Sequence, residues 1–137
     1  MDNIEKISLQ KIFNLAWEHF IVRDEPPAVY NGACMYLTRD GRKCAVGLAL
    51  PEGHMMQNLR VPFGTMVEMY PEMFDEDVRS TSARNLSLFQ FRLHDHMAFR
   101  GGVTEVAWVR TLDERKEAYL AVAKDYGLTV PEDSAAR

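Results

Sequence analysis

Residues 31–53 read NGACMYLTRDGRKCAVGLALPEG, and this stretch decides the expected fold. Two runs with apolar side chains, 33–38 and 43–50, flank a central Asp40-Gly41 dipeptide. An Asp-Gly pair between two such runs is the strongest short-range signal for a β-hairpin. The sequence therefore predicts two antiparallel strands joined by a tight turn.

Helical periodicity dominates the regions on either side of this hairpin. Apolar residues recur at helical spacing over 3–22, and Asp2 or Asn3 can cap that helix. A second long helix is expected over 82–99, where serine and threonine residues precede an apolar stripe. Gly101 follows it at the position of a C-terminal helix cap.

Two further regions are expected to be helical. Segment 54–80 contains prolines that forbid one long helix, so it predicts short helices over 64–70 and 72–78. A capping box at 111–114 starts a last helix, and Gly127 ends it.

The expected architecture is α+β and mostly helical, with four or five helices packed around one β-hairpin or small antiparallel sheet. An isolated hairpin is only marginally stable in water, so this one must pack on the helices. The chain has 137 residues, and residues 1–130 are predicted to form a single globular domain. Residues 131–137, PEDSAAR, are predicted to be a disordered tail.

Composition and charge exclude several classes of protein. The chain has 16 basic and 20 acidic side chains, and this net charge of −4 argues against a general nucleic-acid binder. No apolar run approaches the ~20 residues that cross a bilayer, so no membrane association is expected. The N-terminus lacks the pattern of a signal peptide. We therefore expect a cytoplasmic protein whose two cysteines stay reduced.

The register of the hairpin determines how Cys34 and Cys44 are related. If Asp40-Gly41 alone forms the turn, the two sulfurs point to opposite faces, because side chains alternate along a strand. If residues 39–41 form a three-residue loop, the cysteines are diagonal neighbours on one face, with backbones ~7–8 Å apart. A disulfide needs about 5.5–6 Å, so neither register favours one. Each cysteine either packs as a small hydrophobic residue or, in the second register, lines a shared site.

The segment FQFRLHDHM places four polar side chains on the predicted helix 82–99. On a helical wheel Gln90 and His94 are neighbours on one edge of the core stripe. His96 falls on the other edge, and Asp95 points nearly opposite the stripe. The two histidines and the aspartate are therefore not expected to converge, and a two-histidine metal pair is not expected.

A hairpin docked on the Gln90 edge would bring Cys34 or Cys44 to His94. The thiol could then act as a nucleophile, with His94 as its base and Gln90 as an orienting or oxyanion donor. The two cysteines, His94 and a fourth ligand such as His54 could instead hold zinc, but Cys-x9-Cys is not a recognised zinc spacing. Alternatively, His94 is a border histidine that bonds a backbone carbonyl. We expect no metal and no cofactor.

A second set of residues is predicted to contact a partner. Arg39, Arg42 and Lys43 cluster at the tip of the predicted hairpin. Basic tips are ordinary on solvated surfaces, but this one could also contact a phosphate or an acidic partner. Tyr36 and Asp95 complete the predicted binding set.

Three short motifs follow one another along the chain. C-x-Y begins at Cys34, G-x-K-C-A-x-G runs from Gly41 to Gly47, and Q-x-x-x-H-D begins at Gln90. Together they resemble a family of small uncharacterised bacterial and phage proteins, over nearly the whole chain. The resemblance implies that seven residues belong to the family pattern: Cys34, Tyr36, Cys44, Gly47, Gln90, His94 and Asp95. Two departures are Leu37, where the family usually has arginine, and Phe89, where leucine precedes the glutamine.

Three functions follow as hypotheses from these observations. The first is a phage- or prophage-like protein that binds a host macromolecule, with a protein as the expected partner and inhibition of a defence enzyme as one such role. The second is a cysteine–histidine hydrolase or transferase that uses Cys34 or Cys44 with His94. The third is a structural zinc-binding domain. The sequence leaves open whether the protein is an enzyme.

Overall fold

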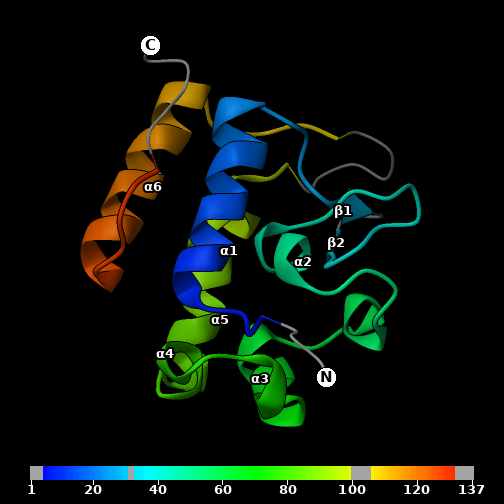
Figure 1. Ribbon diagram of the computed structural model, residues 1–137. Coiled ribbons are helices and arrows are strands. Elements are labelled where there is room, and N and C mark those ends of the chain that lie inside the picture. The colour runs from blue at the N-terminus through cyan, green and yellow to red at the C-terminus, as the bar shows by residue number, and fades with distance from the viewer. Residues whose placement is uncertain (1–4, 31–32, 100–105, 132–137) are drawn as a thin grey trace.

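The computed structural model describes residues 5–30, 33–99 and 106–131. Within these ranges the protein is α+β and mostly helical, as predicted, with one small antiparallel strand pair (Figure 1). The elements in chain order are α1 (Leu9–Ala16), η1 (Trp17–Val22), β1 (Val29–Tyr30), β2 (Ala33–Cys34), α2 (Ala45–Ala49), η2 (Met55–Asn58), α3 (Phe63–Met69), η3 (Pro71–Met73), α4 (Glu76–Arg79), α5 (Ala83–Leu93), η4 (Asp95–Met97) and α6 (Leu112–Tyr126).

The first helix begins later than the sequence predicts. Its N-cap is Ser8, whereas the predicted caps, Asp2 and Asn3, lie outside the described residues. Ile7 is held in a parallel bridge with Phe74, and this extended backbone prevents the helix from starting earlier. After α1 the helix continues as the π-helical segment η1.

The predicted hairpin is present only around its turn. Leu37 and Lys43 form an isolated antiparallel bridge, which matches the three-residue loop, and Gly41 has a φ of +89°. The predicted second strand is wrong, because most of it forms the helix α2. The sulfur of Cys44 caps that helix by accepting a hydrogen bond from the backbone N–H of Gly47. The strand β2 pairs with β1 instead.

A close backbone contact accompanies the helical form of α2. A Cβ atom at Gly47 would lie 2.0 Å from the carbonyl oxygen of Tyr36, so only glycine fits there. Alanine and glycine, which supply three of the five residues of α2, are also poor strand formers. Packing of α2 against α1 then fixes this segment beside the N-terminal helix.

The C-terminal helices follow the predictions more closely. α5 is capped by Ser82 as expected, but it ends at Leu93, earlier than predicted, and Gly101 lies outside the described residues. α6 carries the predicted capping box at Thr111 and ends at Gly127 in the left-handed conformation. The short helices α3, η3 and α4 occupy the segment where short helices were expected.

The helices enclose one apolar core. α6 lies on one side of α1, and α2 with the strand pair lies on the other (Figure 1). None of the helices within the described ranges is long and apolar enough to cross a membrane. The largest fully buried side chains include Phe13, Phe20, Phe63, Phe74, Phe89 and Tyr119.

Candidate ligand-binding site

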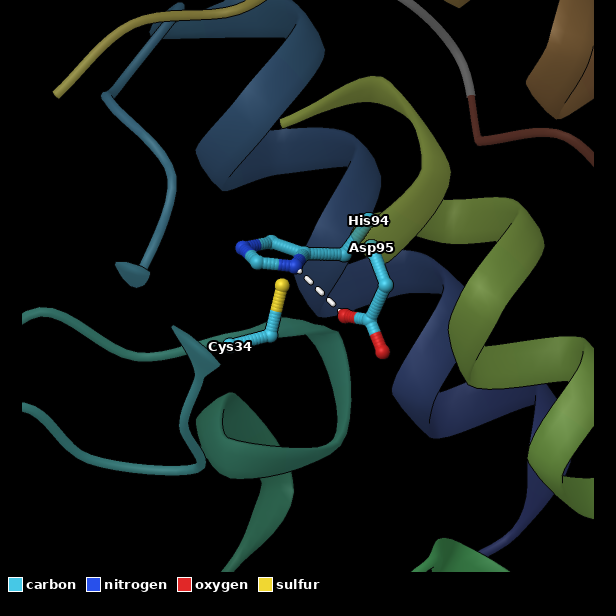
Figure 2. Close-up of side chains that lie close together, drawn as sticks. All are labelled: Cys34, His94 and Asp95. Atoms are coloured by element: carbon cyan, nitrogen blue, oxygen red, sulfur yellow. Dashed lines mark hydrogen bonds and ion pairs between the residues drawn. The ribbon is translucent and has the colours of Figure 1, made fainter. Parts of the chain in front are cut away.

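Cys34, His94 and Asp95 lie together where α5 ends (Figure 2). The cysteine sulfur, one ring nitrogen and one carboxylate oxygen all lie within 4.8 Å of one another. Cys34 comes from β2, and the other two residues come from the turn after α5. The structure thus brings Cys34 to His94, whereas Cys44 lies at the N-terminus of α2, and neither cysteine forms a disulfide.

The end of α5 explains why Asp95 joins this cluster. The helix ends at Leu93, and His94 has φ −146° and ψ −61°, outside the helical region. The chain therefore leaves the helical path, and Asp95 turns to the side that carries Gln90 and His94. The prediction that Asp95 points away is wrong for this reason. His96 stays apart and bonds a backbone carbonyl of α5.

The hydrogen bonds of His94 fix the position of its proton. The backbone N–H of Ala28 donates to Nε2 at 2.9 Å, so Nε2 carries no hydrogen. The neutral ring therefore has its proton on Nδ1, which donates to Oδ1 of Asp95 at 2.8 Å. His94 bonds a backbone N–H rather than the carbonyl expected of a border histidine, and its contact with Asp95 is a hydrogen bond between a neutral ring and a carboxylate.

Gln90 makes an analogous connection from α5. Its Oε1 accepts a hydrogen bond from the backbone N–H of Val46 at 2.9 Å, which orients the side-chain amide. Its Nε2 then donates to Oδ1 of Asp95 at 2.7 Å. Two side chains thus each accept from a backbone N–H and donate to the same carboxylate oxygen. These four hydrogen bonds hold the Gln90 amide, the His94 ring and one oxygen of Asp95 in a fixed arrangement.

Two aromatic rings, those of Phe20 and Trp108, pack against the His94 ring. The His94 side chain is 0% exposed, and its ring centroid lies 5.4 Å from that of Phe20 and 5.5 Å from that of Trp108. The indole N–H of Trp108 donates to the carbonyl oxygen of Glu25, which holds the ring in place. His94 is therefore a packed, internal side chain.

Arg115, which is not among the residues predicted for the site, contacts both Trp108 and Phe20. Its guanidinium lies 4.8 Å from the Trp108 ring and donates to the carbonyl oxygen of Phe20 at 2.9 Å. Arg115 is almost fully buried. The sequence does carry a pattern that indicates its burial, because Arg115, Tyr119 and Val122 follow the i, i+4, i+7 spacing of a core stripe.

A pocket of about 480 Å³ opens beside this cluster. It lies between residues 33–36, residues 59–63 and α5, and Val61, Phe63 and Phe91 contribute apolar walls. Five residues singled out from the sequence line it: Cys34, Tyr36, Cys44, Gln90 and Asp95. His94 is absent from the lining, so the ring lies behind the wall that its hydrogen bond to Asp95 supports.

Cys44 and Tyr36 form inert parts of this wall. Burial raises the pKa of the Cys44 thiol, and the negative charge of Asp95 raises it further. Burial also raises the pKa of Tyr36, followed by the effects of Cys44 and Asp95. The Tyr36 hydroxyl donates to the carbonyl oxygen of Val61 at 2.6 Å, which ties two sides of the pocket together.

The predicted basic tip lies outside the pocket. Arg42 and Lys43 are each paired with a nearby carboxylate, Asp40 at 3.0 Å and Glu52 at 2.7 Å. Arg39 is exposed and lies over a tyrosine ring, 5.7 Å from its centroid. These three residues are not among those that line the pocket.

The polarity around His94 does not suit a metal ion. A histidine that binds a metal donates its other N–H to an acceptor. At His94 the outer partner is the N–H of Ala28, which is itself a donor, and the nitrogen near Cys34 and Asp95 carries the proton. The predicted fourth ligand, His54, accepts a hydrogen bond at the start of η2 instead.

The position of the proton on His94 also decides whether the histidine can act as a base for the Cys34 thiol. In Figure 2 the Cys34 sulfur lies beside the ring nitrogen that faces Asp95. A general base needs an unprotonated nitrogen within reach of the thiol. The facing nitrogen of His94 is protonated, so in this arrangement it can donate to Cys34 but cannot take its proton.

No protein-family model, curated protein or solved structure matches this chain. The geometry of the residues described above therefore carries the functional argument, since function depends on the site rather than on the fold class.

Proposed function

We propose that the protein acts by binding a protein partner, which inserts a side chain into the pocket beside Asp95. The resemblance to bacterial and phage proteins favours a host protein as that partner. The observation that carries the proposal is the hydrogen bond from Ala28 to His94, because it makes the histidine a support for the pocket wall and removes it as a base for Cys34.

The pocket has the properties of a recognition site. Its volume of about 480 Å³ falls within the ~300–1,000 Å³ that is usual for ligand sites. Apolar walls surround a few fixed polar groups, the combination that gives both binding energy and orientation. Phe91 lines the pocket, and it is 43% exposed. Exposed aromatic side chains are frequent anchors of protein interfaces.

The other two hypotheses draw less support from the geometry. A cysteine–histidine enzyme requires His94 to accept the proton of Cys34, and the Ala28 contact opposes that step. A zinc site requires the same nitrogen to be unprotonated. Both functions would need the backbone at Ala28 to move away from the ring.

The test compares pocket variants as baits in a bacterial lysate and then with the purified partner. Phe91→Ala should weaken the measured dissociation constant by about tenfold or more, because it removes an aromatic anchor. Leu120→Ala is the matched control, since Leu120 is a similarly exposed apolar residue on α6, and it should change the constant by less than about twofold.

Cys34→Ala separates binding from catalysis. Stoichiometric binding that survives this change supports the proposal, because recognition then needs no thiol nucleophile. A partner that binds Phe91→Ala and the unchanged protein equally would overturn the role of the pocket. Turnover of a substrate that is lost in Cys34→Ala would overturn the proposal in favour of the enzyme.

A further inference from the structure

We propose that the pocket receives a positively charged group, an ammonium or guanidinium on an apolar stem, and that Asp95 pairs with it. This inference rests on the proposed function and names the chemistry of the inserted side chain, that of lysine or arginine.

The charge of Asp95 has no cationic partner among the described residues. Its two hydrogen-bond donors are the amide of Gln90 and the neutral ring of His94. The ion pairs that lysine and arginine side chains form in the described ranges go to other carboxylates. The Asp95 side chain is only 21% exposed. A carboxylate withdrawn from water in this way is usually paired, which makes a cation the complementary ligand.

Gln90 and His94 hold the Asp95 carboxylate through one of its two oxygens. Both donors bond Oδ1, and in Figure 2 the second oxygen points away from the His94 ring. Asp95 lines the pocket, so a ligand in the pocket can reach that second oxygen. Because Gln90 and His94 already fix the carboxylate, little conformational entropy is lost when a cation binds.

The walls suit the apolar stem of such a ligand. Phe63 and Phe91 line the same space, and aromatic faces attract cations as well as apolar groups. The negative charge of Asp95 contributes to the raised pKa values of Tyr36 and Cys44, so it acts across the pocket. An anionic ligand would meet this same charge and be repelled.

Arg60 is the one basic residue among the described residues that line the pocket. Its side chain is exposed, so water and salt screen its charge more than that of Asp95. Arg60 therefore weakens the attraction for a cation only slightly.

The experiment uses three probes of nearly the same shape and different charge: benzylammonium, benzyl alcohol and benzoate. Each probe is titrated into the full chain, and NMR follows the backbone amide chemical shifts of the residues that line the pocket. Benzylammonium should bind about ten to a hundred times more tightly than benzyl alcohol, the value of one charge-assisted hydrogen bond. Benzoate should bind more weakly than either.

Two variants assign the preference to one residue. Asp95→Asn keeps an acceptor for Gln90 and His94 but removes the charge, so it should bind benzylammonium and benzyl alcohol equally. Glu68→Gln makes the same change of charge at an exposed position on α3 outside the pocket, and it should retain the preference. If Asp95→Asn does not fold, the comparison of the three probes on the unchanged chain still decides the question.

A further pair of probes distinguishes the source of the cation. N-acetyl-lysine methylamide should bind, and N-acetyl-norleucine methylamide, which lacks only the ammonium group, should not. If benzylammonium binds and the lysine derivative does not, the inference that the ligand is a protein side chain is overturned, and a free amine is the ligand. Equal binding of benzylammonium and benzyl alcohol, or no shift with any probe, would overturn the cation site. The proposed function is tested separately: it fails if the purified partner binds Phe91→Ala and the unchanged protein equally.

Discussion

The backbone N–H of Ala28 points at Nε2 of His94, and the two atoms are 2.9 Å apart although the residues are 66 positions apart in the chain. A contact between two side chains could rearrange when a ligand arrives. This donor belongs to the backbone next to β1, so its direction is set by the fold. The protonation and the orientation of His94 are therefore properties of the folded chain.

Removal of the His94 ring should destabilise the fold strongly. His94→Ala leaves the Ala28 N–H without its acceptor and a cavity beside Phe20 and Trp108, so we expect the free energy of unfolding to fall by about 3–5 kcal/mol. Urea denaturation followed by circular dichroism measures this loss. His96→Ala is the control, and it should cost less than about 1 kcal/mol, because that side chain is partly exposed. Equal losses for the two variants would contradict a special role of His94.

A second carboxylate beside Asp95 should make stability depend on pH. In Gln90→Glu the introduced carboxylate still accepts from Val46 but faces the charge of Asp95, and it should cost about 2–3 kcal/mol at pH 7. The like charge raises the pKa of the introduced group in the folded state. The loss should therefore shrink as the pH falls below about 5 and the group takes up a proton. Gln90→Leu carries no charge, and its deficit should not shrink in this way.

The two cysteines should differ in reactivity. Cys44 is 2% exposed, and burial raises the pKa of its thiol, so it should resist iodoacetamide at pH 8. Cys34 lines the pocket and is half-buried, so it should be alkylated first. Peptide mass spectrometry measures both rates, and unfolding in guanidinium should make them equal. Faster alkylation of Cys44 in the folded protein would contradict the placement of the two thiols.

Alkaline pH should destabilise the protein. Burial raises the pKa values of Tyr36, Tyr119 and Cys44 above those of the unfolded chain. Their contribution is fully present below the unfolded pKa values, about 8.5 for cysteine and 10 for tyrosine, and is lost as the pH rises above them. Each group should lower stability by up to about 1.4 kcal/mol per pH unit in that range. Urea midpoints at pH 7, 9 and 10.5 measure the effect, and a constant midpoint would contradict it.

The fold class and the long helices could be predicted because their signals are local. Ser82, Thr111 and Gly127 occupy the cap positions that their side chains or backbone preferences suggest. The helix after Cys44 could not be predicted in this way. The Asp-Gly turn signal is correct for the turn itself, but the segment beyond it is shaped by packing against α1 and against the backbone of Tyr36.

In the candidate site, too, the features with a local sequence pattern could be predicted, and those that depend on long-range contacts could not. The i, i+4 spacing predicted that Gln90 and His94 are neighbours, and both contact Asp95 in the structure. Asp95 was placed on the opposite face because the prediction continued the helix past Leu93. The polarity of His94 depends on the backbone N–H of Ala28, and the sequence carries no local pattern for a contact between such distant residues.

The acidic wall of the pocket is assembled from three separate stretches of chain, at Ala28, at Val46 and along residues 90–95. No fragment that holds only one of them retains the arrangement, so the wall and the native state form together. Mass action then couples occupancy to melting: a pocket ligand at a hundred times its dissociation constant should add about 2.7 kcal/mol to the unfolding free energy. A thermal-shift screen of amines can therefore find ligands before any partner is in hand.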